Sequence, residues 1–113
     1  MADLLRNEVE IELAGQTRTM RASFSAIRAI EKELGKSLVR LINDIGASGD
    51  FSVTDAVTII HHGLRGYNDT RLTLDQIGDA VVVEGFQSKA TAAAEFLKVA
   101  LMGASLGKPQ DAA

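Results

Sequence analysis

The feature that most constrains the fold is a strict alternation of acidic and apolar residues near the start of the chain. Residues 8–13 read Glu-Val-Glu-Ile-Glu-Leu. Alternate residues of a strand point to opposite faces, so this pattern predicts a strand with one apolar face and one charged face. The alternation resumes at residue 17, and the two segments together predict a β-hairpin over residues 7–22.

The turn between the two strands sets their register. A two-residue turn of type II′ needs glycine at its first central position, which suits Gly15 followed by Gln16. This turn places apolar side chains opposite apolar ones and acids opposite bases. The predicted pairs are Ile11–Met20, Val9–Ala22 and Glu10–Arg21. An isolated hairpin is not stable in water, so we expect its apolar face to lie on the helices that follow.

Five later segments carry apolar residues at helical spacing. The predicted helices cover residues 24–34, 38–45, 53–65, 74–84 and 87–103. Gly46 is expected to end the second helix, and Thr73 with Gln76 has the spacing of a capping box at the start of the fourth. Residues 81–83 are three valines and could instead form a short strand. The capping box and Gly85 favour a helix there.

Together these elements predict an α+β fold that is mostly α, with an N-terminal β-hairpin packed on a bundle of four to five helices. A chain of 113 residues with 46% apolar residues fits one domain with one core. We place this domain at residues 1–104. Residues 105–113, which contain Gly107 and Pro109, are expected to form a flexible tail.

The last predicted helix carries more apolar surface than one packing face requires. Ala90, Leu97 and Leu101 belong to a broad apolar face, and we expect that face to pack in the core. A second, narrower stripe contains Ala92, Phe96, Val99 and, nearby, Met102. We expect an isolated domain of this size to bury only one face fully. We therefore predict that the second stripe contacts a partner or a second copy of the chain, although the hairpin could cover it instead.

Composition excludes several classes of function. The chain has no cysteine, which removes disulfides, thiolate metal sites and cysteine nucleophiles, and suits the reducing cytosol. The net charge is −3 and the twelve basic residues are scattered, so we expect no nucleic-acid partner.

No apolar run reaches the roughly 18 residues of a membrane span. Residues 1–6 lack the apolar segment of a secretion signal. The expected location is the cytoplasm of a bacterial host cell.

The adjacent pair His61 and His62 is the one feature that suggests chemistry. Neighbouring residues on a helix point about 100° apart, so the two rings cannot hold one metal ion together. Neither histidine has another histidine four residues away, and no nucleophile is paired with a base. We therefore predict a protein that is not an enzyme and that has no cofactor, metal or catalytic site.

The order of the motifs carries a family resemblance. A hairpin containing Gly15 is followed by Ile30-Glu31 with Leu34-Gly35, then by Gly63-Leu64-Arg65-Gly66, by Thr73 to Ile77, and by Phe96-Leu97 with Ala100-Leu101. This arrangement, over about residues 6–103, resembles the tail assembly chaperone family of gene transfer agents and long-tailed phages. Some members of that family are described as tail tube proteins.

The resemblance implies a binding protein of phage or prophage origin. It implies that the chain covers the long helical tape measure protein during tail assembly, helps to recruit tail tube subunits, and leaves before the particle matures. It implies no catalytic residues. A domain with spare apolar helix surface could cover the apolar stripes of such a partner.

Two other classes of function remain open. In the first, the chain is a structural tail tube or connector component, although tube subunits usually need a larger sheet than one hairpin. In the second, it is a small helical regulatory adaptor. A basic recognition helix is missing, which argues against direct DNA binding.

Overall fold

The computed structural model describes residues 2–3, 7–48 and 51–103. The strands are β1 (Ala2–Asp3), β2 (Glu8–Leu13) and β3 (Gln16–Arg21), and the helices are α1 (Phe24–Leu34), α2 (Leu38–Ser48), α3 (Val53–Gly66), α4 (Leu74–Glu84) and α5 (Phe86–Met102). The predicted fold class, a mostly α fold with an N-terminal hairpin and a helical bundle, is confirmed. The tail predicted at residues 105–113 lies outside the described residues.

The sheet has the order β1-β2-β3 and is antiparallel throughout. The predicted register is wrong by two residues, because Val9 rather than Ile11 lies opposite Met20. The two turn residues are Ala14 and Gly15, with φ of 53° and 77°. Positive φ at both central positions is the geometry of a type I′ turn rather than type II′. A slip of two residues keeps every side chain on its face, so the predicted apolar face survives.

Helix caps follow the sequence closely. Thr73 and Gln76 form the predicted capping box, and α4 continues through the three valines, so the alternative of a strand at 81–83 is wrong. Ser23 accepts a hydrogen bond from the Ala26 N–H at the start of α1. The prediction that Gly46 ends the second helix is also wrong, because α2 continues to Ser48. Glycine weakens a helix interior without forbidding it.

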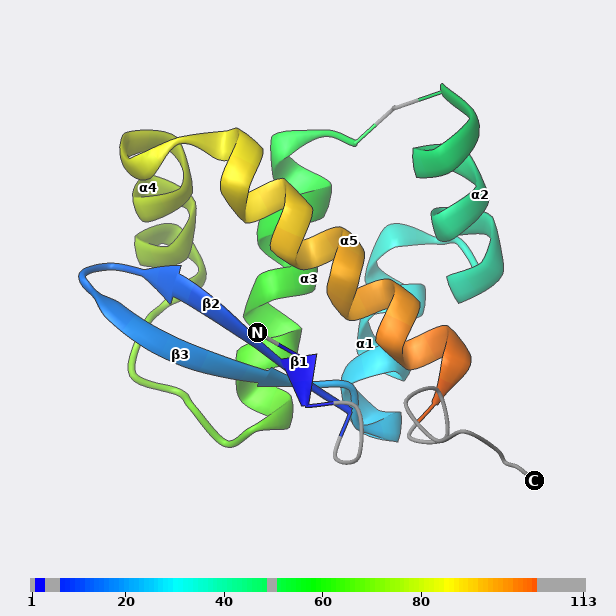
Figure 1. Cartoon of the computed structure of the whole chain (residues 1–113), viewed down its shortest axis with the longest axis horizontal. Helices are drawn as coiled ribbons and strands as arrows, with labels where there is room; N and C mark the ends of the chain where they lie inside the picture. Colours follow the sequence, from blue (N-terminus) through cyan, green and yellow to red (C-terminus); the bar gives the residue numbers. More distant parts are fainter. Residues whose placement is uncertain (1, 4–6, 49–50, 104–113) are drawn as a thin grey trace.

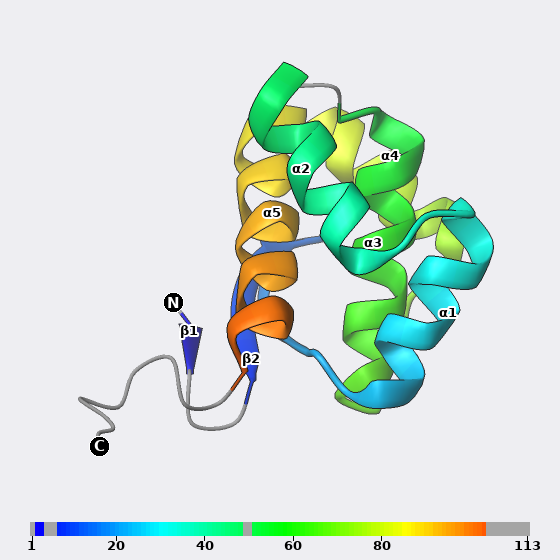
Figure 2. The same cartoon turned by 90° about the vertical axis from the view of Figure 1, so that its right-hand side faces the viewer.

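The core lies where α5 meets the sheet and α3. Figure 1 shows α5 running diagonally across α3, with the hairpin on one flank and α2 on the other, and Figure 2 shows the same layers from the side. The core contains Val9, Leu13, Met20, Ile30, Ile59, Ile60, Leu64, Ile77, Val81, Phe96, Leu97 and Val99. α5 is therefore a central helix that exposes a narrow polar stripe along most of its length and two apolar side chains, Leu101 and Met102, in its last turn.

The close packing of α3 against this core depends on Gly63. A Cβ placed on Gly63 would lie 2.9 Å from the Cβ of Met20 and 3.1 Å from Cε1 of Phe96. A residue with a side chain would have to displace both neighbours. The glycine thus lets the sheet, α3 and α5 meet at one point.

One charged cluster fixes the hairpin to the helices, and a second joins the two strands of the hairpin. The carboxylate of Glu84 accepts a hydrogen bond of 2.9 Å from the N–H of Ala14 and lies 3.2 Å from Nζ of Lys89. Lys89, which is buried, also donates to the carbonyl of Glu12. At the other end of the hairpin, Arg21 and Glu8 form an ion pair across the two strands, with 2.5 Å between Nη2 and Oε2.

Candidate functional site

The two largest residues in the middle of the second apolar stripe of α5 are buried. Phe96 is 0% exposed and Val99 is 2% exposed, so the prediction that these two residues meet a partner is wrong. The hairpin supplies the cover that the prediction assigned to a partner, because β2 packs directly on α5. Ala92 is partly buried and Met102 is 52% exposed; contact of either with a partner stays a prediction.

The other face of α5 also differs from its prediction at one position. Leu97 is fully buried, as expected, and Ala90 is partly buried. Leu101 is 45% exposed, so its predicted place in the core is wrong. Leu101 stands in the last turn of α5, beyond the layers that cover the middle of the helix.

Exposed apolar side chains occur instead on several other elements. The large ones are Phe24, Val39, Val53, Tyr67, Leu74, Val82, Val83, Leu101 and Met102. Three of them, Val53, Leu74 and Val82, line a single groove between α3 and α4. Neither the sequence periodicity nor the capping pattern identified this groove. The one available signal in the sequence was the run of valines at 81–83, because a helix that buries one face does not bury three consecutive residues.

The groove has a volume of about 480 Å³ and is here called the α3–α4 groove. Its lining residues are Val53, Thr54, Val57 and Thr58 from α3, and Leu74, Asp75, Gly78, Asp79 and Val82 from α4. The two helices lie side by side in Figure 1. Among the described residues that line the groove, the only charged ones are two aspartates. The groove is thus an apolar channel with an acidic border.

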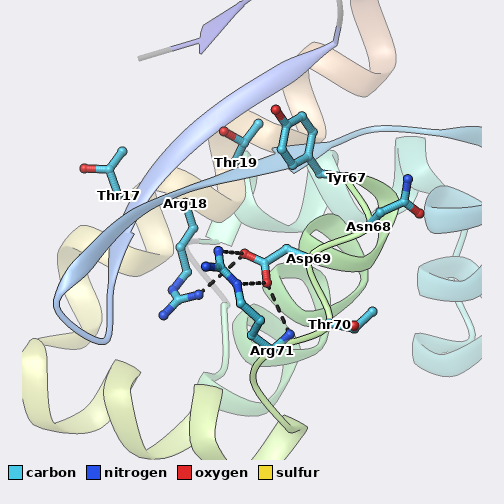
Figure 3. Close-up of a pocket in the computed structure, with 8 residues that line it drawn as sticks. All are labelled: Thr17, Arg18, Thr19, Tyr67, Asn68, Asp69, Thr70 and Arg71. Atoms are coloured by element: carbon cyan, nitrogen blue, oxygen red, sulfur yellow. Dashed lines mark hydrogen bonds and ion pairs between the residues drawn. The ribbon is translucent and has the colours of Figure 1, made fainter.

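A second hollow, of about 320 Å³, is polar and lies between β3 and the loop that joins α3 to α4. Figure 3 shows Arg18 reaching from β3 toward Asp69, and Arg71 approaching Asp69 from the loop. Arg71 binds both carboxylate oxygens of Asp69, at 3.1 and 2.9 Å. Nη1 of Arg18 lies 3.5 Å from Asp69, and Nε of Arg18 donates to the carbonyl of Leu13.

These contacts give Asp69 a strongly perturbed acidity. The hydrogen bonds from the Arg71 side chain stabilise the carboxylate and lower the pKa of Asp69 to about 2. Both carboxylate oxygens accept from arginines, and the Arg71 N–H adds a further bond of 3.2 Å. Because Asp69 is bonded to an arginine of β3 and to an arginine of the loop, the cluster holds the hairpin against the α3–α4 loop. We call these three residues, Arg18, Asp69 and Arg71, the Asp69 clamp. Arg18 was not identified from the sequence, although its position two residues before Met20 places it on the inner face.

The histidine pair connects helices. Nε2 of His62 lies 2.8 Å from a carboxylate oxygen of Glu33, which joins α3 to α1. His61 packs edge-on against His62, and burial lowers the pKa of His61. Among the described residues, no group of three histidines or acids is placed to hold a metal ion. Nor does any described helix have the length and apolar character needed to cross a membrane.

Comparison with known protein families matches residues 6–103 to the family described as phage tail tube protein, GTA-gp10. A search of curated proteins and a search of solved structures gave no match. The matched range covers nearly the whole chain and confirms the resemblance to a tail family of gene transfer agents and phages. That family is a structural phage tail family rather than a known class of enzyme, and it implies association with other tail proteins. The chain belongs to the phage tail tube protein family of GTA-gp10.

Proposed function

We propose that this member of the family is a tail assembly chaperone, which binds the tape measure protein and assists assembly of the tail tube around it. The tape measure protein is a long helical client whose apolar stripes are exposed until the tube encloses them. The chaperone covers those stripes, helps to recruit tube subunits and leaves before the particle matures. The site of action is the bacterial cytoplasm.

The observation that carries this proposal is the contrast between a small sheet and a helical surface with unused apolar residues. The described sheet contains strands of six, six and two residues. A sheet of this size offers little edge for contacts from ring to ring. In contrast, α4 exposes Val82 and Val83 to solvent. Exposed apolar helix surface suits transient binding of a helical partner.

A structural role is the second candidate, and the description of the family as tail tube proteins favours it. In that case the chain would stay in the particle as a tube or connector component. Both candidate functions involve binding to another tail protein. They differ in whether this chain is still present in the particle after assembly. A regulatory adaptor gains no support from the family.

Co-expression tests the proposal. The chain, carrying an affinity tag, is produced together with the tape measure protein and the tail tube protein of the same tail gene cluster. We expect a complex with the tape measure protein that survives size-exclusion chromatography, and tape measure protein that precipitates when the chain is omitted. A tape measure protein that stays dispersed by itself and does not bind the chain contradicts the chaperone role.

A further inference from the structure

The outward face of α4 carries apolar side chains that do not pack in the core. Leu74, Gly78 and Val82 are spaced four residues apart and therefore lie on one face of the helix. Ile77 and Val81 form the buried face that holds α4 against the rest of the chain. Val82 is 65% exposed, although valine is a poorer helix former than alanine, lysine or glutamate. Folding of the chain alone gives no reason for this choice.

The floor of the α3–α4 groove is open because Gly78 has no side chain. A Cβ placed on Gly78 would meet only Cγ1 of Val57, at 3.9 Å, which is ordinary contact. Packing within the chain therefore does not require glycine here, in contrast to Gly63. The glycine keeps the groove deep enough to receive a side chain from outside.

The length of the groove fits a short stretch of helix. Eight residues separate Leu74 from Val82, which corresponds to about 12 Å along the axis of α4. A partner helix laid along this distance places about two turns in the groove. Two turns present apolar anchors at positions i, i+3 or i+4, and i+7, which is the usual pattern of a helix bound in a groove.

The negative charge beside the α3–α4 groove determines which kind of partner helix the groove favours. Asp75 and Asp79 stand one turn apart on α4 and both are exposed. Neither side chain makes a hydrogen bond or an ion pair with other residues in the described ranges. In the part of the chain that the structure describes, no basic residue lines the groove. Two unpaired acids beside an apolar channel favour a partner with lysine or arginine next to its apolar stripe and disfavour an acidic one.

We infer that the α3–α4 groove is the client site, and that its occupant is an amphipathic helix of the tape measure protein whose apolar stripe is flanked by lysine or arginine. This inference rests on the proposed chaperone function and names the surface that performs it.

The first test fills the groove without harming the fold. Gly78→Leu adds a side chain above Val57 and replaces glycine with a better helix former. We expect Tm to stay the same or rise, while the affinity for the purified tape measure protein falls at least about tenfold, since an anchor loses its pocket. Unchanged affinity in this folded variant overturns the inference.

The second test compares two exposed valines. Val82→Lys places a charge in the groove, and Val39→Lys makes the same change on α2, where Val39 is 52% exposed. We expect at least a tenfold loss of affinity for Val82→Lys and none for the control. Equal losses in the two variants, or a loss with Met102→Lys instead, place the client elsewhere and overturn the inference.

The third test concerns the sign of the charge. Asp79→Lys reverses one acid of the border, and Glu95→Lys makes the same change in total charge on the exposed stripe of α5. We expect Asp79→Lys to weaken binding several-fold and to reduce its dependence on salt, with little effect from the control. Stronger binding by Asp79→Lys shows an acidic client and overturns the charge assignment.

Failure of this inference is separable from failure of the proposed function. If the unmodified chain binds the tape measure protein and the groove variants bind it equally well, the chaperone function stands and the site is wrong. If the unmodified chain does not bind, both are wrong. Circular dichroism of each variant confirms that a loss of binding is not a loss of fold.

Discussion

The carboxylate of Glu84, the last residue of α4, accepts a hydrogen bond of 2.9 Å from the backbone N–H of Ala14 at the tip of the hairpin. The two residues are seventy positions apart. The same carboxylate pairs with the buried Lys89 at the start of α5. One side chain thus ties the hairpin turn to the junction of the last two helices, where sheet and bundle must meet for α5 to be covered.

Removal of the Glu84 carboxylate should loosen this junction. Glu84→Ala leaves the Ala14 N–H without its partner and Lys89 without its counter-ion, so we expect a loss of about 1–3 kcal/mol in the free energy of unfolding. Urea unfolding at pH 7 measures it. In the double variant with Lys89→Met the buried charge is gone, and the combined loss should be smaller than the sum of the two single losses. A combined loss equal to the sum of the two single losses would show that Glu84 and Lys89 do not stabilise each other.

Truncation of either stripe of α5 should unfold the domain to a similar extent. Phe96 and Leu97 are both fully buried, so Phe96→Ala and Leu97→Ala should cost about 3–5 and 2–5 kcal/mol respectively. Thermal unfolding followed by circular dichroism checks both. Met102→Ala is the control on the exposed end of α5 and should stay within about 0.5 kcal/mol. A Phe96→Ala variant as stable as that control would place Phe96 outside the core.

Two helical glycines should respond in opposite directions to alanine. Gly63→Ala forces a methyl group against Met20 and Phe96 and should destabilise the fold by about 1–3 kcal/mol. Gly78→Ala meets no obstacle and should stabilise it by about 0.5–1 kcal/mol, because alanine is the better helix former. The midpoints of urea unfolding of the two variants give the comparison. Equal shifts of the same sign are incompatible with the packing around Gly63.

The Asp69 clamp should make the free energy of unfolding depend on pH in the acidic range. The pKa of Asp69 is about 2 in the folded chain, below its ordinary value of 3.8, so the folded state binds this proton less readily than the unfolded state. The contribution of the ionised Asp69 carboxylate to the stability of the fold is present in full above about pH 4–5 and is lost as pH falls through about 2. Asp69→Asn should cost about 1–3 kcal/mol at neutral pH and should flatten the decline below pH 4.

Urea unfolding at pH 7, 4 and 2.5 measures this dependence in the native chain and in Asp69→Asn. The clamp predicts that the difference in stability between the two proteins shrinks as the pH falls. A difference that stays constant from pH 7 to pH 2.5 is the result that contradicts it.

The sequence predicted well what depends on local pattern. The alternation at 8–13 defined the inner face of the hairpin, and Thr73 with Gln76 defined the start of α4. The register was missed because it depends on Ala14 adopting positive φ, which alanine rarely does. The Glu84 contact with the turn stabilises that conformation, and a contact across seventy residues leaves no local signal.

The surface of the molecule was harder to predict than its core. Periodicity showed that α5 has two apolar stripes, but it could not show whether a partner or the chain's own hairpin covers the stripe of Phe96 and Val99. The α3–α4 groove depends on two helices that meet through tertiary packing. In the sequence, only the run of three valines at 81–83 marks it.

The most direct test of the chaperone function is the amount of this chain in finished particles. Quantitative mass spectrometry measures its molar ratio to the tape measure protein in assembly complexes from the cytoplasm and in purified particles. We predict several copies per tape measure protein in the assembly complexes and essentially none in the particles. A fixed ratio that persists in purified particles would contradict the account and identify the chain as a structural component of the tail.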